Sequence, residues 1–467
     1  MNISIAIHPM FQAKSIDMST RPNILFVFAD QMRGMDMHCA GNPDILTSAM
    51  DRLAREGVRG SRHYANCPIC SPNRATMFTG TYPTTHRLLF NDVPVRTDLP
   101  SLGTLAKSHG YATGYIGKWH MDAGPRNRFT PLGPDRLGFD DYWAAYNAHH
   151  DYFDTKYYLD TPELIHRTGY EPEIQTDLAL DFIRNQHTRQ TPFCLALSWG
   201  PPHNDYCYVP EKYRALYDPE KLHLRPNCKP IPRESLDPKW SQLPTTRDYY
   251  AMITSLDDQL GRLLAELDHL GIADNTMVIF TSDHGDMMWS QGLLYKCVPF
   301  EESVQVPLLL RWPQGLPQNR VCTTPIGSVD LLPTLAGLLG WDAPSTFEGV
   351  DVTPWLRGQH IASEPDAVFM AFYNKYVFRP DFPVPEWRGL RTARYTFALR
   401  TDRSCWMLYD NQTDPWQLHN LADDPGSAGL RTELSRRLDR FLLDLGDPFL
   451  DGPGMSRHYN VRTEYVY

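Results

Sequence analysis

The stretch from Cys70 to Arg74, which reads Cys-Ser-Pro-Asn-Arg, places a potential nucleophile one helical turn before a permanent cation. Pro72 suits the first turn of a helix, where its missing N–H is not needed, and Gly80 suits the end of that helix. Cys70 is therefore expected at a helix N-terminus, where free amides and the helix dipole favour a thiolate or a bound anion. The planar guanidinium of Arg74 adds directed donors. These features predict a pocket for a tetrahedral oxyanion.

The residues alone leave two other interpretations of Cys70 open. It can be a buried structural thiol in a helix cap, or it can form a redox pair with Cys67 through the Cys-Pro-Ile-Cys spacing of residues 67–70. A short motif does not choose between these alternatives. The choice depends on the polar residues elsewhere in the chain.

Four apolar runs have the composition of strands that are buried on both faces of a parallel sheet. The runs cover residues 23–29, 111–116, 193–198 and 277–281, and polar residues follow each of them. Ligands of open α/β sheets bind beyond the carboxyl ends of the strands, so we expect these polar residues to converge. They are Asp30, Gln31, Lys118, His120, His203, Asp283 and His284.

The spacing of apolar residues predicts helices among these strands, over 47–56, 102–109 and 253–267. We therefore predict an α/β fold, in which a large domain has a mostly parallel central sheet flanked by helices. Two long stretches, 124–171 and 201–246, are expected to be irregular loops that either wall a substrate cleft or pack on the sheet.

The C-terminal part of the chain shows a different pattern. Residues 389–399 and 406–409 are expected to form strands of an antiparallel hairpin, and apolar residues between 430 and 445 predict a terminal helix. This pattern indicates a smaller C-terminal α+β subdomain with an antiparallel sheet. The expected divisions are an N-terminal extension over 1–20, a catalytic domain over 21–360 and the C-terminal subdomain over 361–467.

The composition is that of a globular protein, with 42% hydrophobic and 21% charged side chains among 467 residues. The formal net charge is −10 and no basic run is present, so we expect no nucleic-acid partner, and any attraction for an anionic substrate must be local. The nine cysteines lack the spacing of a disulfide framework, which predicts free thiols.

The sequence also bears on membranes and export. No segment reaches transmembrane length, so we expect no membrane partner. Residues 1–20 lack the basic region and the full apolar region of an export signal. The default expectation is a cytoplasmic location, and export to the periplasm is the alternative if the start of the chain is misassigned.

Asp30 and Asp283 are carboxylates expected at the ends of separate strands, beside Gln31 and His284. A set of this kind suits a hard divalent cation, which would neutralise substrate oxygens and lower the pKa of an attacking hydroxyl. Each aspartate alone can equally cap a turn. Together with the expected oxyanion pocket, the pair favours a metal centre.

The Cys-x-Pro-x-Arg pattern of residues 70–74 resembles the signature of the type I sulfatases, in which a maturation enzyme oxidises the cysteine to formylglycine. Further motifs resemble landmarks of that family, in the same order, along nearly the whole chain. They are Arg21-Pro22-Asn23-Ile24-Leu25, Gly117-Lys118-Trp119-His120, Thr281-Ser282-Asp283-His284-Gly285-Asp286, and Leu408-Tyr409-Asp410 before Asn420-Leu421. The resemblance implies an alkaline-phosphatase-like architecture and hydrolysis of a sulfate monoester by S–O cleavage, through a sulfated formylglycine.

The resemblance also implies roles for individual residues. The modified Cys70 would be the nucleophile. Arg74 and Lys118 would stabilise its hydrated aldehyde and the bound sulfate, and His120 would assist breakdown of the sulfated hemiacetal. His203 and Lys296, the latter in a Leu-Tyr-Lys context, would hold sulfate and protonate the leaving alcohol.

The implied metal ion is calcium in most of the family, with ligands Asp30, Gln31, Asp283 and His284 and the modified Cys70. Many members have an aspartate where this chain has Gln31 and an asparagine where it has His284. The lost negative charge and the imidazole nitrogen make manganese the alternative metal. The same pair of residues resembles that of the phosphonate monoester hydrolases, which use formylglycine in the same fold.

We therefore expect a sulfuric ester hydrolase that acts on an organic sulfate. A carbohydrate sulfate is the expected class, on family grounds and because the long loops are rich in aromatic residues. The first alternative is a phosphonate or phosphate ester hydrolase of the same fold, and a rival from another class is a non-catalytic binding protein with unmodified Cys70. Expected partners are a sulfated small molecule or saccharide and a formylglycine-generating maturation enzyme. His86, His149 and His150 are candidate cleft residues without an assigned role.

Overall fold

The computed structural model of the protein describes residues 21–229, 245–359, 361–379 and 382–461, so the extension expected over 1–20 lies outside the described residues. Within these ranges, eight strands form a central sheet in the order β11-β2-β10-β9-β1-β8-β4-β5. The strands are β1 (Asn23–Ala29), β2 (Val58–Gly60), β4 (Ala112–Lys118), β5 (Tyr142–Tyr146), β8 (Phe193–Ser198), β9 (Thr276–Ser282), β10 (Leu308–Arg311) and β11 (Arg320–Cys322).

The central sheet is mostly parallel, as predicted. Only β10 breaks the pattern, because it pairs antiparallel with both β9 and β2. The four apolar runs of the sequence form β1, β4, β8 and β9. Their continuous hydrophobicity is explained by burial on both faces: Phe26 and Phe28 enter one core, whereas Leu25 and Val27 enter the other.

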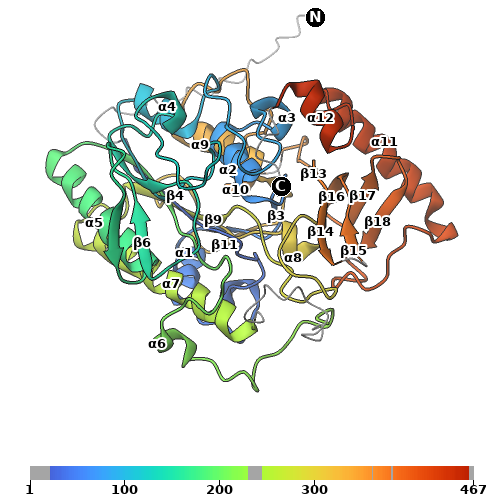
Figure 1. Ribbon diagram of the computed structural model, residues 1–467, viewed down its shortest axis with the longest axis horizontal. Helices are drawn as coiled ribbons and strands as arrows, with labels where there is room; N and C mark the ends of the chain where they lie inside the picture. Colours follow the sequence, from blue (N-terminus) through green and yellow to red (C-terminus); the bar gives the residue numbers. More distant parts are fainter. Residues whose placement is uncertain (1–20, 230–244, 360, 380–381, 462–467) are drawn as a thin grey trace, which may run out of the picture.

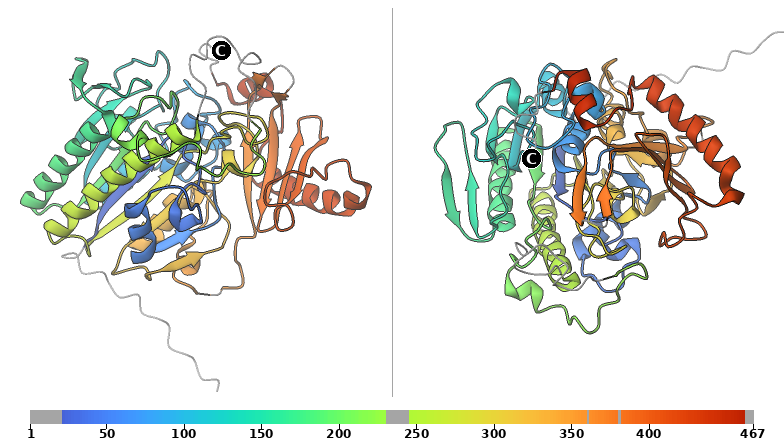
Figure 2. Two further views of the ribbon diagram at one scale, coloured as in Figure 1. Left: turned by 90° about the horizontal axis from the view of Figure 1, so that it is seen from below. Right: turned by 45° about the vertical axis from the view of Figure 1, so that its right-hand side comes forward.

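Helices cover both faces of the central sheet (Figure 2). One face packs against α1 (Ser48–Glu56), α5 (Glu171–Arg189) and α7 (Thr246–His269), and the other against α2 (Cys70–Thr79), α4 (Leu102–Ser108) and α9 (Leu331–Leu339). The predicted helices lie in α1, α4 and α7, within a few residues of their expected ends except at the N-terminus of α7. Short helices complete the layers: α3 (Pro83–His86), α6 (Glu211–Arg214), α8 (Glu301–Val304) and α10 (Thr353–Leu356).

The expectation of an irregular loop over 124–171 was wrong. This stretch contains β5, which pairs parallel with β4, and the hairpin β6 (Asp154–Tyr157) and β7 (Ile165–Thr168). These strands are too short for apolar periodicity to show, and β5 gains its stability from the edge of an existing sheet. The stretch 201–246 contains α6, and its residues 230–244 lie outside the described residues.

A second, antiparallel sheet follows in the order β13-β16-β17-β18, to the right in Figure 1. Its strands are β13 (Ala367–Phe372), β16 (Trp387–Thr392), β17 (Tyr395–Arg400) and β18 (Cys405–Asp410). The run expected over 389–399 is thus two strands joined by a turn. The predicted terminal helix is α11 (Ala428–Asp444), and α12 (Gly452–Tyr459) follows it. The boundaries at 20 and 360 stay predictions.

Two further pairs of short strands form small sheets of their own. They are β3 (His63–Tyr64) with β12 (Ile326–Gly327), and β14 (Tyr376–Arg379) with β15 (Phe382–Val384). Among the helices of the described residues, none is long and apolar enough to cross a bilayer. All nine cysteines are free, as predicted.

Several hydrogen bonds tie the second sheet to the large domain, and three of them lie close to residues of the predicted site. The side-chain amide of Asn66 donates to the backbone carbonyl oxygen of Phe369 at 2.8 Å. The backbone carbonyl oxygen of Asn66 accepts from the amide of Ala371, also at 2.8 Å. The indole of Trp387 donates to the carbonyl oxygen of Cys297 at 2.8 Å. The second sheet therefore fixes the chain just before α2 and the residue after Lys296.

Candidate active site

Helix α2 begins at Cys70, as the sequence predicts, and ends where Gly80 adopts a left-handed φ of 64°. Every residue of this helix is buried. The side chain of Asn73 orients it, since it donates to the carbonyl oxygen of Asp283 at 2.6 Å and accepts from the amide of Asn66 at 3.0 Å. The helix N-terminus therefore faces the carboxyl end of β9.

Four predicted side chains surround the Cys70 sulfur. The amine of Lys296 and Nε2 of His284 each lie 3.2 Å from Sγ, Oδ1 of Asp30 lies 3.9 Å away and the amine of Lys118 lies 4.0 Å away. The sulfur is almost completely buried, as are the side chains around it, and Lys296 is half-buried. The ends of β1, β4 and β9 thus converge on α2.

Arg74 lies behind the cysteine rather than in the open part of the site. Its guanidinium donates to Oδ2 of Asp283 at 2.8 Å and to Oδ2 of Asp30 at 2.9 Å. It also donates to the carbonyl oxygen of Lys118 at 2.7 Å and to Oγ of Ser198 at 2.8 Å. These contacts make Arg74 the residue that holds the two carboxylates in place, whereas a direct contact with sulfate stays a prediction.

The charges of this cluster shift the acidity of its members. Burial raises the pKa of the Cys70 thiol, but Lys118, Lys296 and His284 outweigh it and hold that pKa well below its usual value. Burial and Cys70 oppose ionisation of Asp30, yet Lys118, which donates to it at 2.6 Å, keeps its pKa low, with further help from Arg74. The site is therefore built to stabilise negative charge at residue 70.

The donor set fits a divalent cation. One ligand atom each from Asp30, Cys70, Asp283 and His284 lies within 4.8 Å of all the others, and Nε2 of His284 is 3.6 Å from Oδ1 of both aspartates. Ligands on opposite sides of a bound Ca²⁺ are separated by about 5 Å, so this spacing suits an ion at the centre. Burial and the Asp30 charge also raise the pKa of Asp283, a repulsion that a bound cation would relieve.

Gln31 lies beside this group. Its Oε1 accepts a hydrogen bond from Lys296 at 2.7 Å, and its Nε2 donates to Oδ2 of Asp286 at 2.6 Å and to the hydroxyl of Tyr206 at 3.1 Å. Asp286 also accepts from the amide of Tyr295 at 3.0 Å. We did not single out Asp286 or Tyr206 from the sequence, although Asp286 belongs to the same motif as Asp283.

His203 follows β8 and lies against the site. Its ring stacks on His150 with centroids 4.2 Å apart, and burial together with Lys296 lowers its pKa to about 4. The hydroxyl of Tyr152 donates to the carbonyl oxygens of Gly200 at 3.1 Å and His203 at 3.0 Å, which holds this turn. His150 thus contacts an expected catalytic residue, and its place in a substrate cleft stays a prediction.

A buried carboxyl lies behind the same turn. Glu171 accepts from the Tyr146 hydroxyl at 2.7 Å, and its other oxygen lies 3.2 Å from Nε2 of His149. Burial raises the pKa of Glu171 to about 8 and lowers that of His149 to about 4, so both are neutral near pH 7. His86 is a structural residue instead, because its ring nitrogens bond Thr76 and the amide of Leu88.

His120 follows β4 and is buried beside the thiol, where it contributes to the lowered pKa of Cys70. Its Nε2 faces Oδ1 of Asp92 at 3.6 Å. The close approach of β4 to β8 positions this segment: Gly117 has a φ of 99°, and a Cβ there would lie 2.0 Å from the carbonyl oxygen of Ser198.

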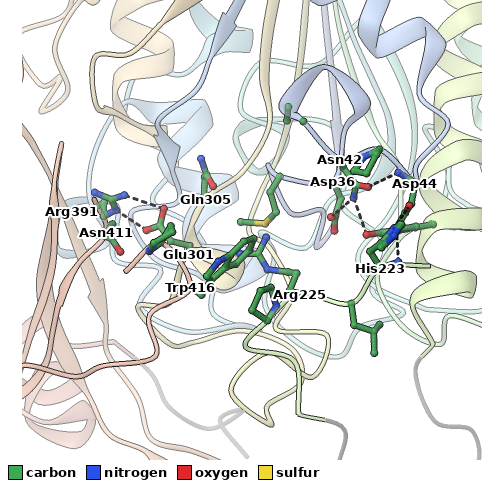
Figure 3. A pocket seen from close by; sticks show the side chains of 18 residues that line it. Asp36, Asn42, Asp44, His223, Arg225, Glu301, Gln305, Arg391, Asn411 and Trp416 are labelled. Atoms are coloured by element: carbon green, nitrogen blue, oxygen red, sulfur yellow. Dashed lines mark hydrogen bonds and ion pairs between the residues drawn. The ribbon is translucent and has the colours of Figure 1, made fainter. Parts of the chain in front are cut away.

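A separate pocket of about 540 Å³ lies between residues 35–44, 223–226 and 411–416 (Figure 3). Its charged side chains are paired. Arg225 bonds Glu302 at 2.9 Å, Arg391 bonds Glu301 at 2.6 Å and His223 bonds Asp44 at 2.9 Å. The predicted catalytic and ligating residues lie elsewhere, around Cys70.

The family model described as Sulfatase matches residues 22–341, and the one described as N-sulphoglucosamine sulphohydrolase, C-terminal, matches residues 290–443. With the strand-end cluster around Cys70, these matches define the class: the chain belongs to the sulfatase family, and its fold is that of the alkaline-phosphatase-like sulfatases. The protein is a sulfatase enzyme, as the motifs of its sequence predict.

Individual relatives agree. The chain is 35% identical over 453 residues to the ulvan-active sulfatase of Formosa agariphila, with 95% of this chain and 85% of the relative covered. It is 25% identical over 494 residues to the N-acetylglucosamine-6-O-sulfatase of Bacteroides thetaiotaomicron, with 90% and 86% covered.

Solved structures show the same fold. One of Bacteroides fragilis, assigned as the sulfatase yidJ, superposes with a TM-score of 0.82 at 30% identity and covers 94% of this chain and 99% of its own. The phosphonate monoester hydrolase of Agrobacterium radiobacter superposes with a TM-score of 0.72 at 24% identity, with 92% and 96% covered, which shows a shared fold alone.

Proposed function

We propose that this sulfatase hydrolyses a sulfate monoester of a carbohydrate, with Cys70 converted to formylglycine and a divalent cation bound beside it. The observation that carries the proposal is the setting of Cys70. Its Sγ lies within 4.0 Å of two amines and of a carboxylate that belongs to the candidate metal group. When present, the hydrated aldehyde supplies a hydroxyl nucleophile and the cation polarises the sulfate.

The residues of this chain then have distinct tasks. Lys118 and Lys296 place two positive charges beside residue 70, where they stabilise the oxygens of a sulfate group in attack. His203 is the candidate to protonate the leaving alcohol, because its turn borders the site and Tyr152 holds it there. Arg74 keeps the carboxylates of Asp30 and Asp283 aimed at the centre of the cluster.

For the cation we propose the ligands Asp30, Asp283, His284 and the modified residue 70, with Gln31 as a further oxygen donor. Calcium is the first choice and manganese the alternative, since the set combines carboxylate oxygens with an imidazole nitrogen. Nε2 of His284 lies 3.6 Å from Oδ1 of Asp30 and 3.6 Å from Oδ1 of Asp283, and this spacing supports the proposed set of ligands.

The proposed substrate class rests on the relatives. One relative is named for ulvan and another for an N-acetylglucosamine sulfate. Because the Cys70 sulfur is buried, the alcohol part of a substrate would lie farther out than its sulfate group, near the half-buried side chains of Lys296 and His150. We propose no nucleic-acid partner, and a formylglycine-generating maturation enzyme as the protein partner.

The first experiment determines the chemical state of residue 70. Mass spectrometry of the peptide that contains it, after co-expression with the maturation enzyme, should show formylglycine, and Cys70→Ala should abolish sulfatase activity. A thiol that persists at residue 70 would favour the binding-protein alternative. Cys67→Ser should leave activity intact, whereas a redox pair requires its loss.

A second experiment separates ester classes, because Gln31 and His284 also resemble the residues of the phosphonate monoester hydrolases. The matured enzyme is given an aryl sulfate and an aryl phosphonate monoester side by side, and then a panel of sulfated monosaccharides. We expect a higher kcat/KM for the sulfate and turnover of at least one sugar. A clear preference for the phosphonate would replace the proposal with its alternative.

A further inference from the structure

We propose that Asp92 is a positioning residue for His120. Its carboxylate holds the imidazole in the tautomer and orientation with which His120 removes a proton from the hydroxyl of residue 70, so that sulfate is expelled. This inference rests on the proposed function of the Cys70 site. It adds a residue that belongs to none of the sequence motifs.

The state of His120 is the first observation. The imidazole is 2% exposed, and both of its ring nitrogens lack a hydrogen-bond partner in the described part of the chain. A buried polar group without a partner costs free energy, and such a group is retained where a ligand completes its bonds. His120 lies close enough to Cys70 to lower the pKa of its thiol, and its Nε2 lies 3.6 Å from Oδ1 of Asp92.

The backbone of both residues is the second observation. Asp92 has a φ of 62° and His120 a φ of 53°, so both have a left-handed backbone conformation that is uncommon for residues other than glycine. One lies in the segment after α3 and the other directly after β4. Strained conformations of this kind persist where the surrounding structure requires them, and they gather at functional sites.

The third observation is the way in which Asp92 is held. Arg126 donates to it through Nε at 3.1 Å and through its terminal nitrogen at 2.9 Å. Burial opposes ionisation of this carboxylate, but His120 and Arg126 outweigh it and keep the pKa of Asp92 low. Asp92 is therefore a fixed negative charge between Arg126 and His120.

The chemistry follows from this order of groups. With the carboxylate opposite Nε2, the imidazole proton sits on Nε2 and the lone pair of Nδ1 is free to act as a base. His120 takes the proton of the hydroxyl on Cβ of residue 70. The O–H electron pair becomes the second bond of a carbonyl, the C–O bond to sulfate breaks, and sulfate leaves with the electron pair of that broken C–O bond. Asp92 stabilises the imidazolium until its proton returns to solvent.

The alternative is a structural role, in which Asp92 only forms an ion pair with Arg126 and so stabilises the loop that contains them. The two roles predict different kinetics. A structural defect slows every step, whereas a positioning defect slows the expulsion of sulfate and leaves release of the alcohol intact. The test variant is Asp92→Asn, which keeps size and polarity.

The matched control is Asp122→Asn. Asp122 is also a buried aspartate near an arginine, with Arg128 Nε at 3.5 Å, and it lies two residues after His120. We expect this variant to keep wild-type kinetics.

The kinetic experiment follows the matured enzymes with a chromogenic aryl sulfate in a stopped-flow instrument. Asp92→Asn should release one equivalent of phenol per active site in a fast phase and then turn over about 10²- to 10⁴-fold more slowly than wild type, as aspartate-to-asparagine changes in acid–imidazole pairs do. Intact-mass analysis in that phase should show enzyme one sulfate heavier. Equal slowing of both phases, or no sulfated enzyme, would overturn the proposal.

Two further measurements test the pair by other readouts, and the first of them does not need the matured site. The ¹⁵N shifts of the His120 ring, recorded on protein with unmodified Cys70, should show an Nε2–H tautomer that becomes mixed in Asp92→Asn; an unchanged tautomer contradicts the proposal. In a His120→Ala background, Asp92→Asn should add no further loss of turnover, and additive losses would refute the pairing. If wild type and Asp122→Asn also lack sulfatase activity, the proposed function fails, while the tautomer still tests the pair.

Discussion

Arg74→Lys is the most informative substitution at this site, because it keeps the positive charge and removes only the geometry. The guanidinium of Arg74 makes four hydrogen bonds, two of them to the carboxylates of Asp30 and Asp283. The four acceptors lie around the planar guanidinium, which donates to them through all three of its nitrogens. A lysine amine is a single point on a flexible stem and cannot reach all of them.

The size of the effect follows from these contacts. Hydrogen bonds to charged groups contribute about 1.5–3 kcal/mol each, so losing two lowers the free energy of unfolding by about 3–6 kcal/mol. The carboxylates would also lose their alignment toward the cation. Second-layer contacts of this type change metal affinity by about 10–100-fold.

The assay combines urea unfolding with calorimetric titration of Ca²⁺ and Mn²⁺. Arg388→Lys is the control. Arg388 lies in strand β16 of the second sheet, is as buried as Arg74, and bonds the carboxylate of Asp447 at 2.6 Å. We expect both variants to unfold at lower urea and only Arg74→Lys to bind the cation more weakly. Unchanged cation affinity in Arg74→Lys, or an equal loss in Arg388→Lys, would refute the role assigned to Arg74.

Three other outcomes are expected. Gly117→Ala should lower the free energy of unfolding by more than Gly41→Ala, because both glycines have a φ near 100° but a Cβ at Gly117 meets the Ser198 backbone whereas one at Gly41 meets open space; urea unfolding of the two variants checks this. Glu171→Gln should flatten the pH dependence of stability: burial raises the pKa of Glu171 from 4.5 to about 8, so between these values the folded chain binds the extra proton and wild type loses stability as pH rises, which unfolding at about pH 5, 7 and 9 would show. Chelation should abolish activity reversibly, and His284→Asn should lower reactivation by Mn²⁺ relative to reactivation by Ca²⁺, as metal-titrated activity would reveal.

Much of the fold follows directly from the sequence. The runs that became β1, β4, β8 and β9 are apolar on both faces, and only strands at the centre of a covered sheet have this composition. The antiparallel direction of β10 was not predicted, because its apolar run resembles those of the parallel strands. Strand β5 was not predicted, because the conformation of its five residues depends on pairing with β4.

The site shows the same limit. Residue types that follow buried strands indicated where Asp30, Lys118 and Asp283 would meet, and the structure brings them together. Spacing does not reveal which acceptors a guanidinium faces, so the position of Arg74 behind the carboxylates was not foreseen. Asp92 carries no sequence signal, because its approach to His120 depends on how the segment after α3 folds back.

The hydrogen bonds that link the second sheet to the large domain limit how this enzyme can be re-engineered. Trp387 holds the residue after Lys296, and Phe369 and Ala371 hold the residue four positions before Cys70. A chimera joined near residue 360 would therefore combine a lysine from one parent with the strand that sets its position from the other. Recombination designs that exchange single surface loops, and leave these cross-links within one parent, have the better prospect of retaining turnover.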